Sequence, residues 1–212
     1  MDDVIRKIPN WLTLLRIALI PVFVLLMHEP EDWMVYFATF VFIVAAFTDY
    51  LDGVVARRYG AVSDLGKLLD PVADKILVMA ALVMLVAQRS DMYGEPWVPG
   101  WMVVLVLARE TWVTGLRTVA ASRGVIVPAN TTGKYKSALQ MFAIVLLLLH
   151  DKMALPLLGR EYTAQALGAF LLLLSIGFSY WGAYEYTREI LLIPRRQDPE
   201  APGQPAAPDK PE

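Results

Sequence analysis

Apolar residues fill six long stretches of this chain, and short segments with Pro, Gly or charged residues separate them. Each stretch is close to the roughly 20 apolar residues that one helix needs to cross a bilayer core. The pattern therefore predicts an all-α, polytopic membrane protein. We expect its six transmembrane helices at about residues 10–28, 33–57, 67–88, 97–122, 134–150 and 164–191.

Lysine and arginine are distributed unevenly over the segments that join these helices. One side holds most of them, whereas the other holds only Arg89, Lys152 and Arg160. Because cytoplasmic loops carry an excess of Lys and Arg, we expect both termini on the cytoplasmic side. Four tryptophans suit lipid-facing positions at the two interfaces: Trp33, Trp97, Trp101 and Trp181.

The two ends of the chain differ from its centre. Residues 1–8 read as a short amphipathic juxtamembrane segment, and residues 9–192 form the membrane domain. From residue 197 to residue 212 a proline recurs at every third position among Ala, Asp, Glu and Gln. This composition favours a disordered, Pro-rich cytoplasmic tail.

The amino-acid composition excludes several classes of function. Hydrophobic residues make up 57% of the chain and charged residues 19%, which is unlike an ordinary soluble domain. The chain has no Cys and 2 His, so a thiol nucleophile, a zinc–thiolate site and a Ser-His-Asp triad are not expected. A net charge of −2 gives no reason to expect nucleic acid as a partner.

Four aspartates lie in or at the ends of apolar helices, where each charge costs about 2.5–3.5 kcal/mol at mid-bilayer. Asp49 and Asp52 are three residues apart in one predicted helix, and Asp70 and Asp74 are four apart in the next. Each pair therefore shares a helix face. The short connection makes the two helices antiparallel neighbours, so the four carboxylates are expected to converge near the cytoplasmic side.

A bound cation would offset the cost of these carboxylates, because hard oxygen ligands suit Mg²⁺, Ca²⁺ and Mn²⁺. Four carboxylates can neutralise two divalent ions, as two-metal phosphoryl chemistry requires. Gly53 and Gly66 leave room for a ligand or a backbone, and Arg57 can bind phosphate oxygens. The alternative is intramembrane salt bridging with nearby cations, namely Arg57, Arg58, Lys67 and Lys75.

The pattern Asp-x2-Asp-Gly-x2-Ala-Arg-x8-Gly-x3-Asp-x3-Asp resembles the signature of the CDP-alcohol phosphatidyltransferases. Every fixed position is present without a change of spacing, at Asp49, Asp52, Gly53, Ala56, Arg57, Gly66, Asp70 and Asp74. The resemblance covers about residues 9–190. It implies six transmembrane helices, a CDP-linked lipid donor, an acceptor alcohol and CMP as the leaving group.

The resemblance also implies roles for individual residues. The four aspartates would ligate two divalent cations, Mg²⁺ or Mn²⁺, and Asp74 would also take the proton from the attacking hydroxyl. The CDP-lipid would bind at Gly53, Ala56, Arg57 and Gly66, with help from Asn10, Thr13 and Arg16 on the first helix. Membrane lipids surround such enzymes, and a homodimer and a place in the bacterial inner (cytoplasmic) membrane follow from the same likeness.

Cations in the second half of the chain bear on the acceptor. Arg109, Arg117, Lys134 and Lys136 fall on the same predicted side as the aspartates and read as an anion subsite. Their segments are similar to the bacterial branch of the family, which transfers the phosphatidyl group of CDP-diacylglycerol to sn-glycerol 3-phosphate. Positive-inside charge, and an ion pair between Arg109 and Glu110, are the alternative interpretations.

Three other functions stay open from the sequence. Within the family, the acceptor could be phosphatidylglycerol, as in a cardiolipin synthase, or inositol phosphate. Outside it, intramembrane aspartates also serve ion or proton transporters, although a proton relay does not need Gly53-x2-Ala56-Arg57 beside the acids. A prenyl-diphosphate enzyme shares the metal chemistry but not a cytidine requirement.

Overall fold

Each of the six apolar stretches forms one α-helix in the computed structural model. The structure describes the backbone of residues 2–59, 64–90, 94–122, 132–150, 154–157 and 160–192, and the side chains of residues 11–48, 72–90, 94–122, 136–150 and 163–192. The helices are α1 (Asp2–Leu26), α2 (Asp32–Tyr59), α3 (Asp64–Ala87), α4 (Gly100–Ser122), α5 (Thr132–Leu149) and α6 (Ala164–Leu192). The all-α prediction is confirmed for these ranges, apart from one short hairpin.

The predicted boundaries agree with the helices to within a few residues, except at the start of α1. That helix begins at Asp2 and runs through Pro9, so residues 2–8 are its first turns. Their place at the membrane surface stays a prediction. The Pro-rich tail at 197–212 lies outside the described residues.

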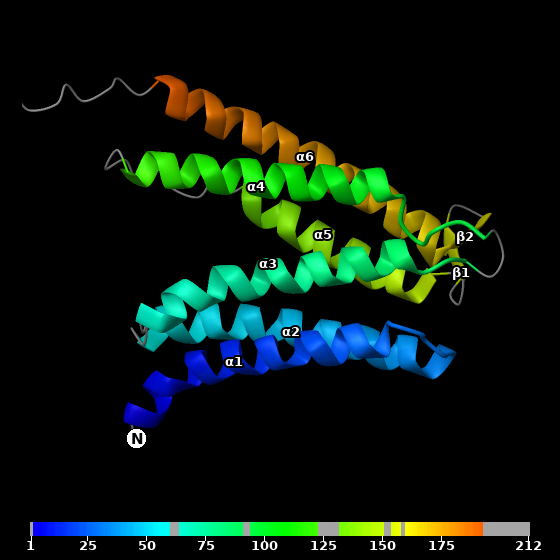
Figure 1. Ribbon diagram of the computed structural model, residues 1–212, viewed down its shortest axis with the longest axis horizontal. Helices are drawn as coiled ribbons and strands as arrows, with labels where there is room; N and C mark the ends of the chain where they lie inside the picture. Colours follow the sequence, from blue (N-terminus) through cyan, green and yellow to red (C-terminus); the bar gives the residue numbers. More distant parts are fainter. Residues whose placement is uncertain are drawn as a thin grey trace, which may run out of the picture.

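The helices pack as two groups that meet along α5 (Figure 1). α1 packs against α2 and α3, whereas α6 packs against α5 and α4. The first turn of α1, the end of α2, the start of α3 and the ends of α4 and α6 lie at one end of the bundle (Figure 1). This end is the one on which the sequence places most Lys and Arg.

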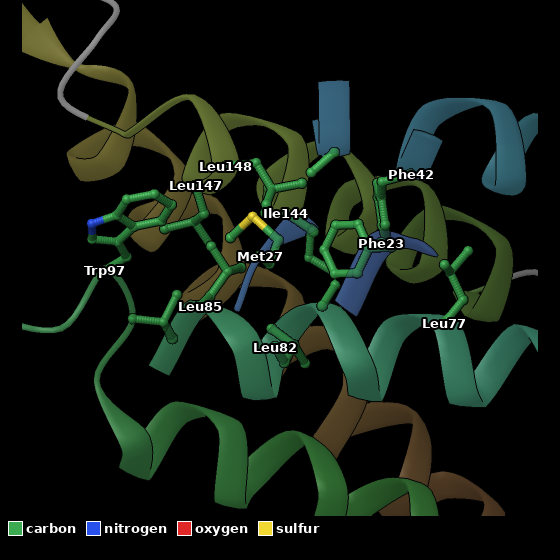
Figure 2. Packing of buried hydrophobic residues seen from close by; sticks show 14 of the residues in the cluster. Phe23, Met27, Phe42, Leu77, Leu82, Leu85, Trp97, Ile144, Leu147 and Leu148 are labelled. Atoms are coloured by element: carbon green, nitrogen blue, oxygen red, sulfur yellow. The ribbon is translucent and has the colours of Figure 1, made fainter. Parts of the chain in front are cut away.

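The centre of the bundle is a continuous apolar core (Figure 2). Phe23 of α1, Met27 directly after α1, Phe42 of α2, Leu82 of α3 and Leu147 of α5 are 0% exposed. The outer surface is apolar too, with exposed side chains that include Trp11, Leu25, Phe40, Val104, Phe170 and Leu191. Large exposed apolar surfaces of this kind mark contact with lipid or another protein.

One helix within the described residues, Ala164–Leu192, is long and apolar enough to cross a membrane. Three shorter apolar helical stretches accompany it: Trp11–Leu26, Asp32–Thr48 and Lys136–Leu149. The described residues thus form six helices, and length and composition mark one of them as a candidate membrane span.

Between α5 and α6 the chain forms a hairpin that the apolar pattern did not predict. β1 (Ala154–Leu157) pairs antiparallel with β2 (Arg160–Thr163), and Ala154 lies opposite Thr163. Strands of four residues are too short for an alternating pattern to stand out. The hairpin lies at the end of the bundle opposite the first turn of α1 (Figure 1).

The prediction for Trp97 was wrong, whereas the other three tryptophans are exposed as expected. Trp33, Trp101 and Trp181 are more than half exposed, but Trp97 is 4% exposed. Its ring stacks on His150 at the end of α5, with ring centroids 3.8 Å apart. The segment before α4 folds inward over the core, so this indole packs inside the protein rather than against lipid.

Gly168 lets α5 and α6 pack closely at this position. A Cβ atom at this position would lie 2.8 Å from Leu147 Cγ and 3.0 Å from both Ala143 O and Leu147 N. Backbone atoms cannot move aside as a flexible side chain can. Helices with small residues at the interface pack closely in this way in membranes.

We expect Gly168→Ala to lower the thermal midpoint of the detergent-solubilised protein. Overpacking typically destabilises a protein by about 1–3 kcal/mol. The higher helix propensity of alanine offsets only ~1 kcal/mol of this cost. Gly182→Ala on the same helix is the matched control, since a Cβ there meets nothing within 4 Å. A thermal midpoint that changes equally in both variants would contradict this account of the α5–α6 contact.

Candidate functional site

The four aspartates of the motif lie at matching levels of the α2–α3 pair. Asp49 is about ten residues before the end of α2, and Asp74 is about ten residues after the start of α3. At 1.5 Å per residue each lies ~15 Å from the turn, while Asp52 and Asp70 lie ~10 Å from it. Figure 1 shows α2 and α3 joined at one end and running back along each other, so these bounds put all four positions in the same part of the bundle.

The structure describes the side chain of one of these aspartates. Asp74 is partly buried, and its carboxylate acts favourably on the Lys136 ammonium of α5. The side chains of Asp49, Asp52 and Asp70 lie outside the described residues, and no group of three or more potential metal ligands occurs among those described. An all-carboxylate donor set still fits Mg²⁺ or Mn²⁺ better than softer metals.

The positions assigned to the CDP-lipid lie on the first three helices. Thr13 and Arg16 are one turn apart on α1, and both are buried, at 1% and 0% exposed. They therefore face the interior of the bundle rather than lipid. Asn10, Gly53, Ala56, Arg57 and Gly66 lie on α1, α2 and α3, but their side-chain surroundings are outside the described residues.

A network of charged side chains connects α4, α5 and α6. Glu110 Oε1 accepts a hydrogen bond of 2.8 Å from Arg109 Nη1 and another from Lys136 Nζ. Arg109 Nε also donates to the carbonyl of Ser179 at 3.0 Å. The side chains of Arg109 and Lys136 are 13% and 8% exposed. The ion pair foreseen as an alternative for Arg109 is therefore present.

The other two predicted anion-binding cations lie apart from this network. Arg117 is about two turns further along α4, where its guanidinium lies 5.9 Å from the centre of the Tyr186 ring on α6. Lys134 is in the first turn of α5, but its side chain is outside the described residues. Of the four predicted residues, Arg109 and Lys136 thus share the partner Glu110. Arg117 lies between α4 and α6.

The family follows from a comparison of the whole chain with known families. Residues 6–181 match the family described as CDP-alcohol phosphatidyltransferase. The chain belongs to this family. The matched residues include the complete aspartate motif and most of α6, so the chain is an enzyme of the phosphatidyltransferase type.

Individual relatives of the phosphatidyltransferase agree with this assignment. The chain is 43% identical to the CDP-diacylglycerol–glycerol-3-phosphate 3-phosphatidyltransferase of Bacillus subtilis, over 68% of this chain and 78% of the relative. It is 39% identical to the enzyme of the same name from Rickettsia bellii, over 84% and 95%. A cardiolipin synthase (CMP-forming) of Oryza sativa is 33% identical, over 88% and 58%.

Near Asp74, α3 and α4 are joined by a contact that sequence reasoning missed. Lys75 Nζ donates to Thr114 Oγ1 across the α3–α4 boundary at 2.6 Å. The sequence analysis considered Lys75 as a partner for the aspartates, and Thr114 was not singled out. Thr114 is four residues after Glu110 and so lies on the same face of α4, which is the signal that could have found it.

An open apolar groove of about 620 Å³ follows the outer face of α4. Its described lining residues carry no charge, and the small residues Ala108 and Gly115 make room for it. Val104 and Leu116 lie near its two ends, ~18 Å apart along the helix. A groove of this length and composition suits a hydrocarbon chain rather than a phosphate group.

Proposed function

We propose that this enzyme transfers the phosphatidyl group of CDP-diacylglycerol to sn-glycerol 3-phosphate, giving phosphatidylglycerophosphate and CMP. The observation that carries the proposal is that the aspartate motif lies close to the network of cations. The α2–α3 aspartate motif ends in Asp74, which acts on Lys136 of the cation network on α4 and α5. The printed names of the Bacillus and Rickettsia relatives support the same reaction.

The donor binds on the α1–α3 group. Asp49, Asp52, Asp70 and Asp74 would hold two divalent cations, Mg²⁺ or Mn²⁺, which supply charge neutralisation at the diphosphate when they are bound. Gly53, Ala56, Arg57 and Gly66 contact the CDP portion, together with Asn10 and Thr13 of α1. The burial of Thr13 supports a position that faces this interior.

Asp74 acts as the general base. Its carboxylate accepts the proton of the acceptor hydroxyl while that oxygen attacks the phosphorus that carries the lipid. The bond between this phosphorus and the oxygen bridging to CMP breaks, and CMP leaves with the electron pair. The Asp74 carboxylate attracts the Lys136 ammonium. Lys136 is therefore close enough to hold the acceptor beside this carboxylate.

The acceptor phosphate binds to cations of α4 and α5, namely Arg109, Arg117, Lys134 and Lys136. Charge-assisted hydrogen bonds to phosphate are stronger than hydrogen bonds between neutral groups. Their strength increases further in a site that is partly removed from water. The burial of Arg109 and Lys136 supports this assignment. Glu110 holds both cations in place.

The protein spans the bacterial inner membrane six times, with both termini and the active site on the cytoplasmic side. The position of the start of α1 and the end of α6 at one end of the bundle supports an even number of crossings (Figure 1). Lys and Arg at that end of the helices support its cytoplasmic orientation. Residues 1–8 lie along the membrane surface, residues 9–192 form the catalytic domain and residues 197–212 form the tail.

The function is tested with purified protein, CDP-diacylglycerol and a panel of acceptors, with and without Mg²⁺ or Mn²⁺. We expect metal-dependent release of CMP with glycerol 3-phosphate and little with glycerol, serine or inositol. Phosphatidylglycerol belongs in the panel because the Oryza relative is a cardiolipin synthase. Faster release with phosphatidylglycerol or with an unphosphorylated alcohol would contradict the proposed acceptor.

A further inference from the structure

Lys75 follows Asp74 directly on α3, but its ammonium is directed to another helix. Lys75 Nζ lies 2.6 Å from Thr114 Oγ1 of α4. The Thr114 hydroxyl donates its one proton to the Glu110 carbonyl at 2.7 Å, so it accepts the bond from Lys75 through a lone pair. The position of this ammonium is therefore fixed by a hydroxyl that α4 itself orients.

Three cations from three helices lie along residues 109–114 of α4. They are Lys75 of α3, Arg109 of α4 and Lys136 of α5. Glu110 binds Arg109 and Lys136, whereas the one partner of Lys75 within the described part of the chain is the neutral Thr114 hydroxyl. Among the described side chains at this place, these three cations stand against two carboxylates, those of Glu110 and Asp74. The contact between Lys75 and Thr114 is exposed, so an anion can reach this ammonium and form charge-assisted hydrogen bonds with it.

We propose that Lys75 binds the phosphate of the acceptor and thereby selects a phosphorylated alcohol over an unphosphorylated one. This inference rests on the proposed function and adds a residue to its acceptor site. An ammonium has three N–H donors, of which Thr114 takes one, so two are left for phosphate oxygens. Lys75 also adjoins Asp74, so a phosphate held here keeps the rest of the acceptor near the base.

The test compares Lys75→Met, Lys75→Arg and Thr114→Val in steady-state kinetics, with each substrate varied in turn. We expect Lys75→Met to raise the KM for glycerol 3-phosphate about ten- to hundredfold, while the KM for CDP-diacylglycerol changes less than twofold. The inhibition constant of inorganic phosphate, as a competitor of the acceptor, should rise in parallel. Lys75→Arg should recover part of the loss, and Thr114→Val should produce a smaller rise.

Arg188→Met is the matched control, because it removes an exposed positive charge from the same end of the bundle. Its KM values should equal those of the wild type. An unchanged KM for glycerol 3-phosphate in Lys75→Met would overturn the inference, as would an equal rise for both substrates. If Lys75→Met does not fold, a wild-type KM in both Lys75→Arg and Thr114→Val would overturn it instead. A wild-type enzyme that does not use glycerol 3-phosphate would refute the proposed function itself.

Discussion

Asp74→Asn is expected to lower kcat by at least about a hundredfold, because general base catalysis typically contributes 10²–10⁴. An amide cannot take the proton from the acceptor hydroxyl, and this loss is felt in the transition state. The KM for CDP-diacylglycerol should change much less, since three other carboxylates of the motif are retained. Steady-state kinetics at saturating Mg²⁺ or Mn²⁺ separates the two effects.

Glu189→Gln provides the control for Asp74→Asn. It is the same acid-to-amide change at an exposed position of α6, outside the motif. Its kcat should remain that of the wild type. A normal kcat in Asp74→Asn, with only a higher metal concentration required, would limit Asp74 to metal binding.

Asp52→Asn is expected to reduce transfer to less than a tenth of the wild-type rate at any metal concentration. The change removes one anionic ligand from the proposed metal site but keeps the size of the side chain. It also relieves a charge that is costly within a membrane, so the thermal midpoint should not fall. The measurement is CMP release over a titration of Mg²⁺ or Mn²⁺, with a melting curve of the same preparation.

Either of two results would contradict this ligand assignment for Asp52. One is a rate above a tenth of the wild type under saturating metal. The other is a collapse of the thermal midpoint, which would indicate that Asp52 stabilises the fold through a salt bridge instead. The intramembrane salt bridge considered from the sequence would then be the better interpretation.

The helices could be predicted from the sequence because their length and apolar character are local properties. α3 and α5 begin and end within a few residues of the expected positions. The hairpin at 154–163 could not, since four-residue strands carry too little pattern. The burial of Trp97 was also hidden, because it depends on a stacking partner, His150, that is more than fifty residues away.

The candidate site also has a part that the sequence predicts and a part that it does not. Helical periodicity and the fixed spacing of the motif are enough to assign the aspartates to shared faces. The contacts that α4 makes, such as Lys75 with Thr114 and Glu110 with Lys136, depend on how neighbouring helices are rotated and shifted. No local pattern specifies that rotation. Acidic and basic residues could be enumerated from the sequence, but their pairing could not.

The tight α5–α6 contact at Gly168 has a consequence for how a lipid substrate enters and leaves. CDP-diacylglycerol diffuses in the plane of the bilayer, so it must reach the site sideways between two helices. Parting α5 from α6 would break a contact in which backbone touches backbone and side chain. α3 and α4 touch over a much smaller part of their described lengths. We therefore expect the lipid to enter between α3 and α4, beside Asp74 and the cations proposed to bind the acceptor, while the α5–α6 pair stays fixed.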